Sequence, residues 1–303
     1  MKKSILTALV ILFMAASVQQ ANAQYDFSDE LYYDHAVTYE IGASVAAMNC
    51  FTDIGGKKGA GQKSYKDLNL SNSQLAGSVF FTANYKYAIG LKLEATFGKV
   101  KAADNALEKV KQTTNGRYDR NLSFKSNIIE LTLALEIHPL YFKRYKEGRK
   151  LPRFSPYLTG GIGYFSFNPQ AMLNGQWVDL KPLSTEGEGF AEYPDRKPYK
   201  LKQLNFPVGF GIKYKVTPLY NVSIECVSRI LNTDYLDDVS TTYIDQSLFA
   251  HYLSGPQLNN ALLLNDRQKE LDPTHVTNAG WQRGNPAKND SYFTFNLKMS
   301  LIF

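Results

Sequence analysis

The sequence has no long hydrophobic run beyond its first residues, and this excludes a membrane-spanning helix. No stretch after Gln24 comes near the roughly eighteen consecutive apolar residues that such a helix needs. Histidine is also scarce, with 4 residues, and none is spaced as a pair with another histidine or a cysteine. A zinc site therefore has no support, and no cofactor is expected.

Positive charge is not concentrated either. The net charge is +6, and the basic residues scatter along the chain with one exception. This scatter excludes a nucleic-acid partner.

The first residues predict an export signal. Lys2 and Lys3 give a positive start, 5–16 form a short apolar run, and Ala21-Asn22-Ala23 is a small-residue cleavage site. We therefore expect residues 1–23 to be a cleaved signal peptide and residues 24–303 to form a single domain.

Cysteine is rare, with only Cys50 and Cys226 in the chain. They fall on different predicted strands, and an exported protein can form disulfides, so whether they pair stays open. Cys226 alternates with apolar residues, which favours a small buried or lipid-facing thiol.

Apolar and polar residues alternate regularly in several segments of the sequence. The alternation is clearest at 293–303, where phenylalanine, leucine and methionine alternate with threonine, asparagine, lysine and serine. Similar segments occur at 38–48, 75–87, 91–98, 125–137, 155–166, 204–216 and 220–230. The 20 tyrosines and 18 phenylalanines suit the two water–lipid interfaces of a membrane barrel. The sequence thus predicts an all-β protein, an antiparallel transmembrane outer-membrane β-barrel of about eight strands.

The connections support this prediction because short and long ones alternate. Residues 88–90 and 217–219 are short turns, whereas 50–74, 100–121, 167–202 and 232–290 are long loops, which we expect outside the cell. A soluble lipocalin-like barrel would also alternate. Two features favour the membrane: the aromatic Phe303 at the end of the last strand, and charged residues on the predicted polar faces that could pair inside a narrow lumen. These residues are Glu40, Glu94, Glu130, Glu225, Lys86, Lys92, Lys213, Arg229 and Lys298.

The one basic concentration lies in the connection 141–153, which breaks the short-turn rule. By the predicted topology it faces the periplasm, and it carries three aromatic residues beside its cations. It could dock an acidic protein, or it could be a solvated turn near anionic lipid headgroups. The candidate docking residues are Lys143, Arg144, Lys146, Arg149, Lys150 and Arg153.

Two other loop features are weak evidence for a metal site and for a hydrolase site. Asp234, Asp237, Asp238 and Asp245 could bind calcium, but no EF-hand spacing is present and aspartates commonly cap turns. His251 or His275 with Ser254 and an aspartate could form a hydrolase site, but no strand fixes these residues. Local hydrogen bonding within the loop explains the aspartates, scattered polar loop residues explain the histidines and the serine, and we expect no enzyme.

Several segments together carry a family resemblance. They are Gly160-Gly161-Ile162-Gly163-Tyr164-Phe165-Ser166-Phe167-Asn168-Pro169, Leu180-Lys181-Pro182-Leu183-Ser184-Thr185-Glu186-Gly187, the stretch 234–245 and Arg283-Gly284-Asn285-Pro286-Ala287-Lys288-Asn289-Asp290. With them the chain resembles the PorG-like outer-membrane barrels of Bacteroidetes, which are components of the type IX secretion system. The most specific piece is the loop with Asp234, Tyr235, Asp237 and Asp238, whose role the resemblance does not give.

The resemblance implies a non-enzymatic barrel in the cell outer membrane, contacting its lipids. It would tie the periplasmic ring of the secretion machine, a lipoprotein and its partner, to that membrane. The alternative is a structural or surface-binding barrel that acts through its extracellular loops. A loop-based hydrolase ranks last.

Overall fold

The computed structural model describes residues 36–57, 63, 68–142 and 152–303. The predicted signal peptide, residues 1–23, lies outside this part of the chain, as do five of the six candidate docking residues, those from Lys143 to Lys150.

Eight antiparallel strands close into a barrel, as the alternation predicted. The strands are β1 (Val37–Phe51), β2 (Gln74–Tyr85), β3 (Ile89–Ala103), β4 (Ser123–Ile137), β5 (Phe154–Ser166), β8 (Lys202–Lys215), β9 (Tyr220–Leu231) and β10 (Ser291–Ile302). Closure comes from two pairings: the first and last strands pair along their length, with Ser44 opposite Lys298, and β3 pairs with β4. Each strand therefore has two neighbours, and the barrel leaves no open edge.

The two faces of each strand differ in the way a membrane barrel requires. Leu131 and Leu133 of β4 point outward and are 54% and 47% exposed, while Thr132 between them is buried inside. Phe295 and Leu297 of β10 are likewise 54% and 56% exposed. The outer wall is thus apolar and the inner wall polar, the reverse of an ordinary soluble protein.

This pattern inverts along β3. Up to Phe97 the outward residues are apolar, but farther along the outward residues are Lys99 and Lys101 and the inward ones are Val100 and Ala102. The strand keeps its alternation while its surroundings change from apolar outside to water outside. The inward apolar residues belong to a hydrophobic core at this end of the barrel, with Met48 and Phe124 among its members.

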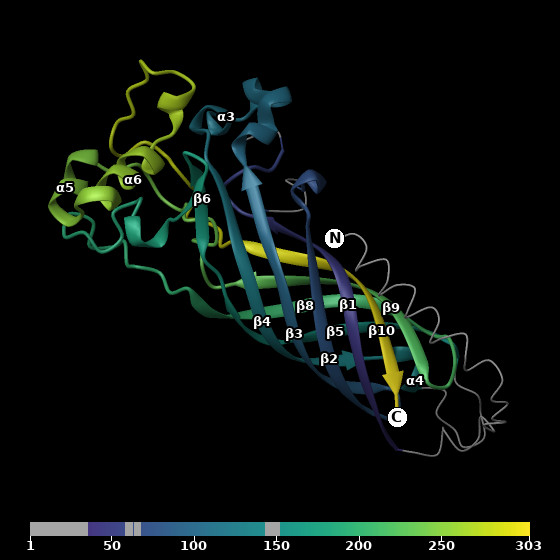
Figure 1. Cartoon of the computed structure of the whole chain (residues 1–303). Coiled ribbons are helices and arrows are strands. Elements are labelled where there is room, and N and C mark those ends of the chain that lie inside the picture. The colour runs from purple at the N-terminus through teal and green to yellow at the C-terminus, as the bar shows by residue number, and fades with distance from the viewer. Residues whose placement is uncertain (1–35, 58–62, 64–67, 143–151) are drawn as a thin grey trace, which may run out of the picture. The chain divides into compact units, whose positions relative to one another are not determined.

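The two ends of the barrel differ in size (Figure 1). At one end, long loops carry η3 (Asp104–Thr113), α3 (Arg117–Arg120), the hairpin β6 (Pro169–Leu173) and β7 (Gln176–Asp179), η4 (Lys181–Leu183), η5 (Gln246–Leu248), α5 (Phe249–Tyr252), α6 (Gly255–Asn265) and η6 (Gln268–Glu270). We call the folded loops 52–57, 63, 104–122, 167–201 and 232–290 the cap. A further 3-10 turn, η2 (Leu70–Asn72), precedes β2 at this end, and the opposite, short-turn end carries α4 (Pro139–Phe142). No helix within the described ranges is long and apolar enough to cross a membrane.

Candidate functional site

The barrel interior is filled by paired charges. Lys92 Nζ lies 3.1 Å from Glu94, 3.1 Å from Glu136 and 3.0 Å from Glu225. Lys298 Nζ joins the same group, 3.0 Å from Glu94 and 2.7 Å from Glu225. These side chains come from β3, β4, β9 and β10, so the network crosses the lumen and links strands that are not neighbours.

Two further pairs extend this network toward the barrel ends. Arg229 Nε lies 3.1 Å from Glu130 Oε2 on the cap side. Lys213 Nζ lies 3.2 Å from Glu40 Oε1 on the short-turn side. Of the nine charged residues expected to face the lumen, eight do so. Lys86 was the wrong prediction: it lies in the turn after β2 with φ of 48°, because β2 ends one residue earlier, at Tyr85.

The acidic loop motif is the centre of the cap. Asp237 accepts hydrogen bonds from the backbone N–H groups of Ile54 and Val239, each at 3.0 Å. Asp238 accepts one from the Tyr199 hydroxyl and one from the Thr185 hydroxyl, both at 2.6 Å. The motif therefore ties together three separate cap loops.

A second acidic group surrounds one lysine. Lys63 Nζ lies 2.8 Å from Asp53 and 3.3 Å from Asp290, and it also pairs with Asp234. Burial raises the pKa of Asp234 to about 7, although Lys63 acts in the opposite direction. Burial and the nearby Asp53 likewise raise the pKa of Asp237 to about 7. The lysine is the counterion of this group, and no cluster among the described residues is arranged to hold a metal ion.

Tyr235, the remaining residue of the motif, stacks on Tyr199 with ring centroids 4.9 Å apart and an angle of 8° between the planes. Both rings border the hydrophobic core beneath the cap. The role of the four motif residues in this structure is to hold the cap together.

The residues that complete the cap were not among the candidate site residues. Glu186 is fully buried and accepts hydrogen bonds from the N–H groups of Ser240 and Thr241, and Arg283 pairs with it at 3.0 Å. Arg120 pairs with buried Asp104 at 2.9 Å. Glu186 and Arg283 do lie in the segments that carried the family resemblance, but nothing in their spacing shows that they meet.

The two cysteines are both free, and each is partly buried. Cys226 lies on the outward side of β9, as expected for a lipid-facing thiol, whereas Cys50 packs against the core beneath the cap.

The residues of the hydrolase hypothesis do not form a site. His251 and Ser254 are exposed, and His275 lies with its ring centroid 6.3 Å from that of Trp281. Within the described part of the chain, no hydrogen bond joins Ser254 to either histidine.

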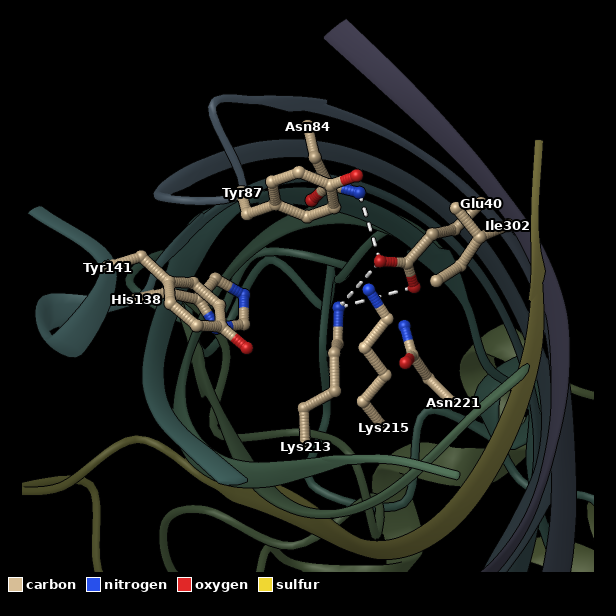
Figure 2. A pocket seen from close by; sticks show the side chains of 9 residues that line it. All are labelled: Glu40, Asn84, Tyr87, His138, Tyr141, Lys213, Lys215, Asn221 and Ile302. Atoms are coloured by element: carbon tan, nitrogen blue, oxygen red, sulfur yellow. Dashed lines mark hydrogen bonds and ion pairs between the residues drawn. The ribbon is translucent and has the colours of Figure 1, made fainter. Parts of the chain in front are cut away.

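The short-turn end has a basic and aromatic opening, drawn in Figure 2. It holds a cavity of about 20 Å³, space for one water-sized molecule, and the aromatic rings of Tyr87, His138 and Tyr141 line it. His138 and Tyr141 stack at 5.7 Å, and Lys213 and Lys215 extend into the opening from the other side. We call this opening, with lining residues Glu40, Asn84, Tyr87, His138, Tyr141, Lys213, Lys215, Asn221 and Ile302, the short-turn mouth.

Arg153 is the one candidate docking residue that the structure describes. It is exposed just before β5, and its carbonyl accepts a hydrogen bond from Lys215 N–H at 2.8 Å. The end of the basic connection is thereby tied to the strand that supplies the lysines of the short-turn mouth.

Comparison with known proteins gives a family and a fold. The family model described as "Domain of unknown function (DUF6089)" matches residues 30–251. No curated protein matches the chain.

Among solved structures, Ail, the attachment invasion locus protein of Yersinia pestis, is similar over 89% of this chain and 100% of its own, at 9% identity and a TM-score of 0.37. The outer membrane protein OprG from Pseudomonas aeruginosa is similar over 88% of this chain and 96% of its own, at 11% identity and a TM-score of 0.37. Neither comparison bears on the resemblance to the PorG-like family.

Proposed function

The chain belongs to the family described as a domain of unknown function (DUF6089), and from the resemblance of its loop segments to the PorG-like barrels we propose that it is a non-enzymatic barrel of the outer membrane that acts in type IX secretion. In this role it anchors the periplasmic ring, a lipoprotein and its partner, at the membrane.

The apolar outer wall supports the proposed location in a membrane. Aromatic rings mark both of its ends: Tyr39 lies 5.8 Å from Phe81 and 6.0 Å from Phe303 at the short-turn end, and Phe51 stacks on Phe293 at 5.1 Å beneath the cap. Rings of this kind suit the two interfaces of a bilayer. The long cap loops then face the outside and the short turns face the periplasm.

Because the interior is filled, we expect the function to lie at the two ends of the barrel and not in the lumen. Charges that cross the lumen and pair leave no path for a solute, and eight strands enclose a space that side chains fill. The barrel therefore works through a surface.

The observation that carries the docking proposal is the short-turn mouth. Arg153 is exposed on the same end as the basic connection 141–153, and Lys215 Nζ lies 5.3 Å from the centroid of the Tyr87 ring, whereas Lys213 is already paired with Glu40. Arginine and aromatic side chains supply much of the binding energy at protein interfaces, and positive charge selects an acidic partner. We therefore propose an acidic surface of the periplasmic ring as the partner of this end.

Site-specific cross-linking in living cells tests the partner. A photoreactive residue in place of Arg153 should capture a ring protein, and one in place of Trp177, an exposed residue of the cap, should not. Capture of ring proteins from neither position would contradict the proposal.

A surface-binding barrel is the second candidate, and the folded cap is the observation that favours it. Besides the core that it shares with the barrel, the cap has a hydrophobic cluster of its own, which includes Leu183, Phe190 and Phe249. Loops that serve only as connections do not need such a core. Normal secretion by a strain that lacks the protein would favour this candidate.

A further inference from the structure

The cap contains a cavity that neither the barrel nor the proposed docking requires. Its volume is about 230 Å³, room for a small molecule of several heavy atoms but not for a chain segment. It lies between the α3 region and the segments around residues 243 and 281, and its lining includes Asp53, Tyr243, Trp281 and Gln282.

The aromatic wall of the cavity is held on rigid backbone. Tyr243 N–H donates to the Trp281 carbonyl at 2.9 Å, and Gly280 N–H donates to the Tyr243 carbonyl at 2.9 Å. Next to them, Gly284 packs so closely on Ser240 that an added Cβ would lie 2.6 Å from its backbone. Trp281 nevertheless remains 48% exposed. An indole carried on this backbone has few rotatable bonds left to order when a ligand covers it.

The polar groups of the lining suit a ligand rich in hydroxyls. Asp53 Oδ2 is used by Lys63 and by the N–H of Asn285, but none of the described residues donates a hydrogen bond to Oδ1. Gln282 uses its amide nitrogen on the Gly284 carbonyl at 3.0 Å, which leaves its amide oxygen as an acceptor. The amides of Asn115 and Gln268 also line the cavity. A hydroxyl can donate to the carboxylate and accept from an amide at once.

The charges argue against an anionic ligand. Three arginines line the cavity: Arg120 pairs with Asp104 at 2.9 Å, Arg283 pairs with Glu186 at 3.0 Å, and Arg117 donates to the backbone carbonyls of Gly55 and Lys57. At Arg120 and Arg283 an anion would have to compete with these buried carboxylates, and it would also meet the carboxylate of Asp53. An uncharged ligand meets no such cost.

We propose that this cavity binds one uncharged pyranose sugar, with an apolar face of the ring on Trp281 and its hydroxyls on Asp53 and the surrounding amides. Tyr243 closes the cavity beside the indole. The site is separate from the short-turn mouth, so it stands or falls independently of the secretion role.

Saturation-transfer NMR on the full chain in detergent micelles tests the proposal. The probes are the methyl glycosides of glucose, galactose, mannose and N-acetylglucosamine, and inorganic phosphate serves as a competitor. We expect at least one glycoside to receive saturation and phosphate not to displace it.

The chain provides a matched pair of variants, because its only tryptophans are Trp177 and Trp281 and both are exposed on cap loops. Trp281→Ala should weaken binding of the sugar at least tenfold, and Trp177→Ala should leave it unchanged. Asp53→Asn supplies a second test, with an expected severalfold loss. A heat-modifiable gel shift establishes that each variant is folded.

Three results would overturn the inference: no glycoside receives saturation, the two tryptophan variants bind equally well, or phosphate displaces the sugar. The last result would make the cavity an anion site. None of them changes what is expected at the short-turn mouth.

Discussion

Arg283 shows how the cap depends on single buried charges. Its guanidinium donates to Glu186, to the Asp238 carbonyl and to the Asn265 carbonyl, and it is only 2% exposed. Removing one member of a buried pair leaves the other desolvated and unpaired, which costs more than the pair contributes.

Arg283→Leu should therefore lower the free energy of unfolding of the cap by about 3–5 kcal/mol. Arg267→Leu is the control, because the side chain of its partner Glu270 is 41% exposed and the pair contributes about 0–1 kcal/mol. Hydrogen exchange of the cap amides measures both. Equal protection in the two variants would contradict the role given to Arg283.

Glu188 makes the cap sensitive to pH. Burial, together with the charges of Asp238 and Glu186, raises its pKa to about 8. A carboxyl group with a raised folded-state pKa favours the folded state fully below its unfolded-state pKa, and that contribution is lost as the pH rises through the folded-state value.

Glu188→Gln removes this titration. The variant should match the wild type near pH 4 and become more stable than it by about 1 kcal/mol or more at pH 9. Thermal melts at the two pH values measure the difference. A difference that does not change with pH would show that Glu188 does not titrate in this range.

Among the elements, β3 shows what periodicity can and cannot predict. The sequence predicted a strand at 91–98, and the structure extends it to Ala103. The prediction stopped where Lys99 and Lys101 replaced apolar residues, because the expected pattern assumes lipid outside along the whole strand. All eight strands were nevertheless found, since each has an apolar outward face over most of its length.

The contacts within the cap were less accessible to sequence analysis. The acidic motif was noticed, but its partners Ile54, Thr185 and Tyr199 lie 39 to 183 residues away along the chain. Spacing along a sequence does not encode such contacts. The hairpin of β6 and β7 was also missed, since it lies inside a stretch expected to be loop.

Two adjacent glycines of β5 differ in what they permit. An added Cβ at Gly161 would lie 2.1 Å from the Leu133 carbonyl oxygen of β4, whereas one at Gly160 would meet only the Pro207 carbonyl at 3.9 Å. Backbone cannot give way as a flexible side chain can, so the first position tolerates no side chain.

Gly161→Ala should reduce the yield of folded barrel severalfold on refolding into detergent, and Gly160→Ala should leave it near the wild-type value. The gel shift between folded and unfolded forms measures the yield. Similar yields for the two variants would mean that β4 and β5 lie less close together than the structure shows.

The described part of the chain forms a closed barrel with two different ends. Lys92 and Lys298 bridge carboxylates across the lumen, so we expect no continuous water path for ions. In planar lipid bilayers the purified protein should give no steady conductance steps. Regular open steps at low voltage would contradict a filled interior and would reopen a transport function.

At this scale the central claim is that the barrel holds the secretion ring through its short-turn end. The most direct measurement compares secreted cargo in the medium and the periplasm of a strain that lacks the gene. Three complementing copies are needed: the wild type, a copy with Lys143, Arg144, Lys146, Arg149, Lys150 and Arg153 neutralised, and a control copy with the exposed cap-side lysines Lys99, Lys101 and Lys109 neutralised.

The account predicts that cargo accumulates in the periplasm of the deletion strain. The wild type and the cap-side control should restore secretion, and the copy neutralised in the 141–153 connection should not. Rescue by that copy would keep the secretion role and remove the docking site. Unchanged secretion in the deletion strain would contradict the central claim.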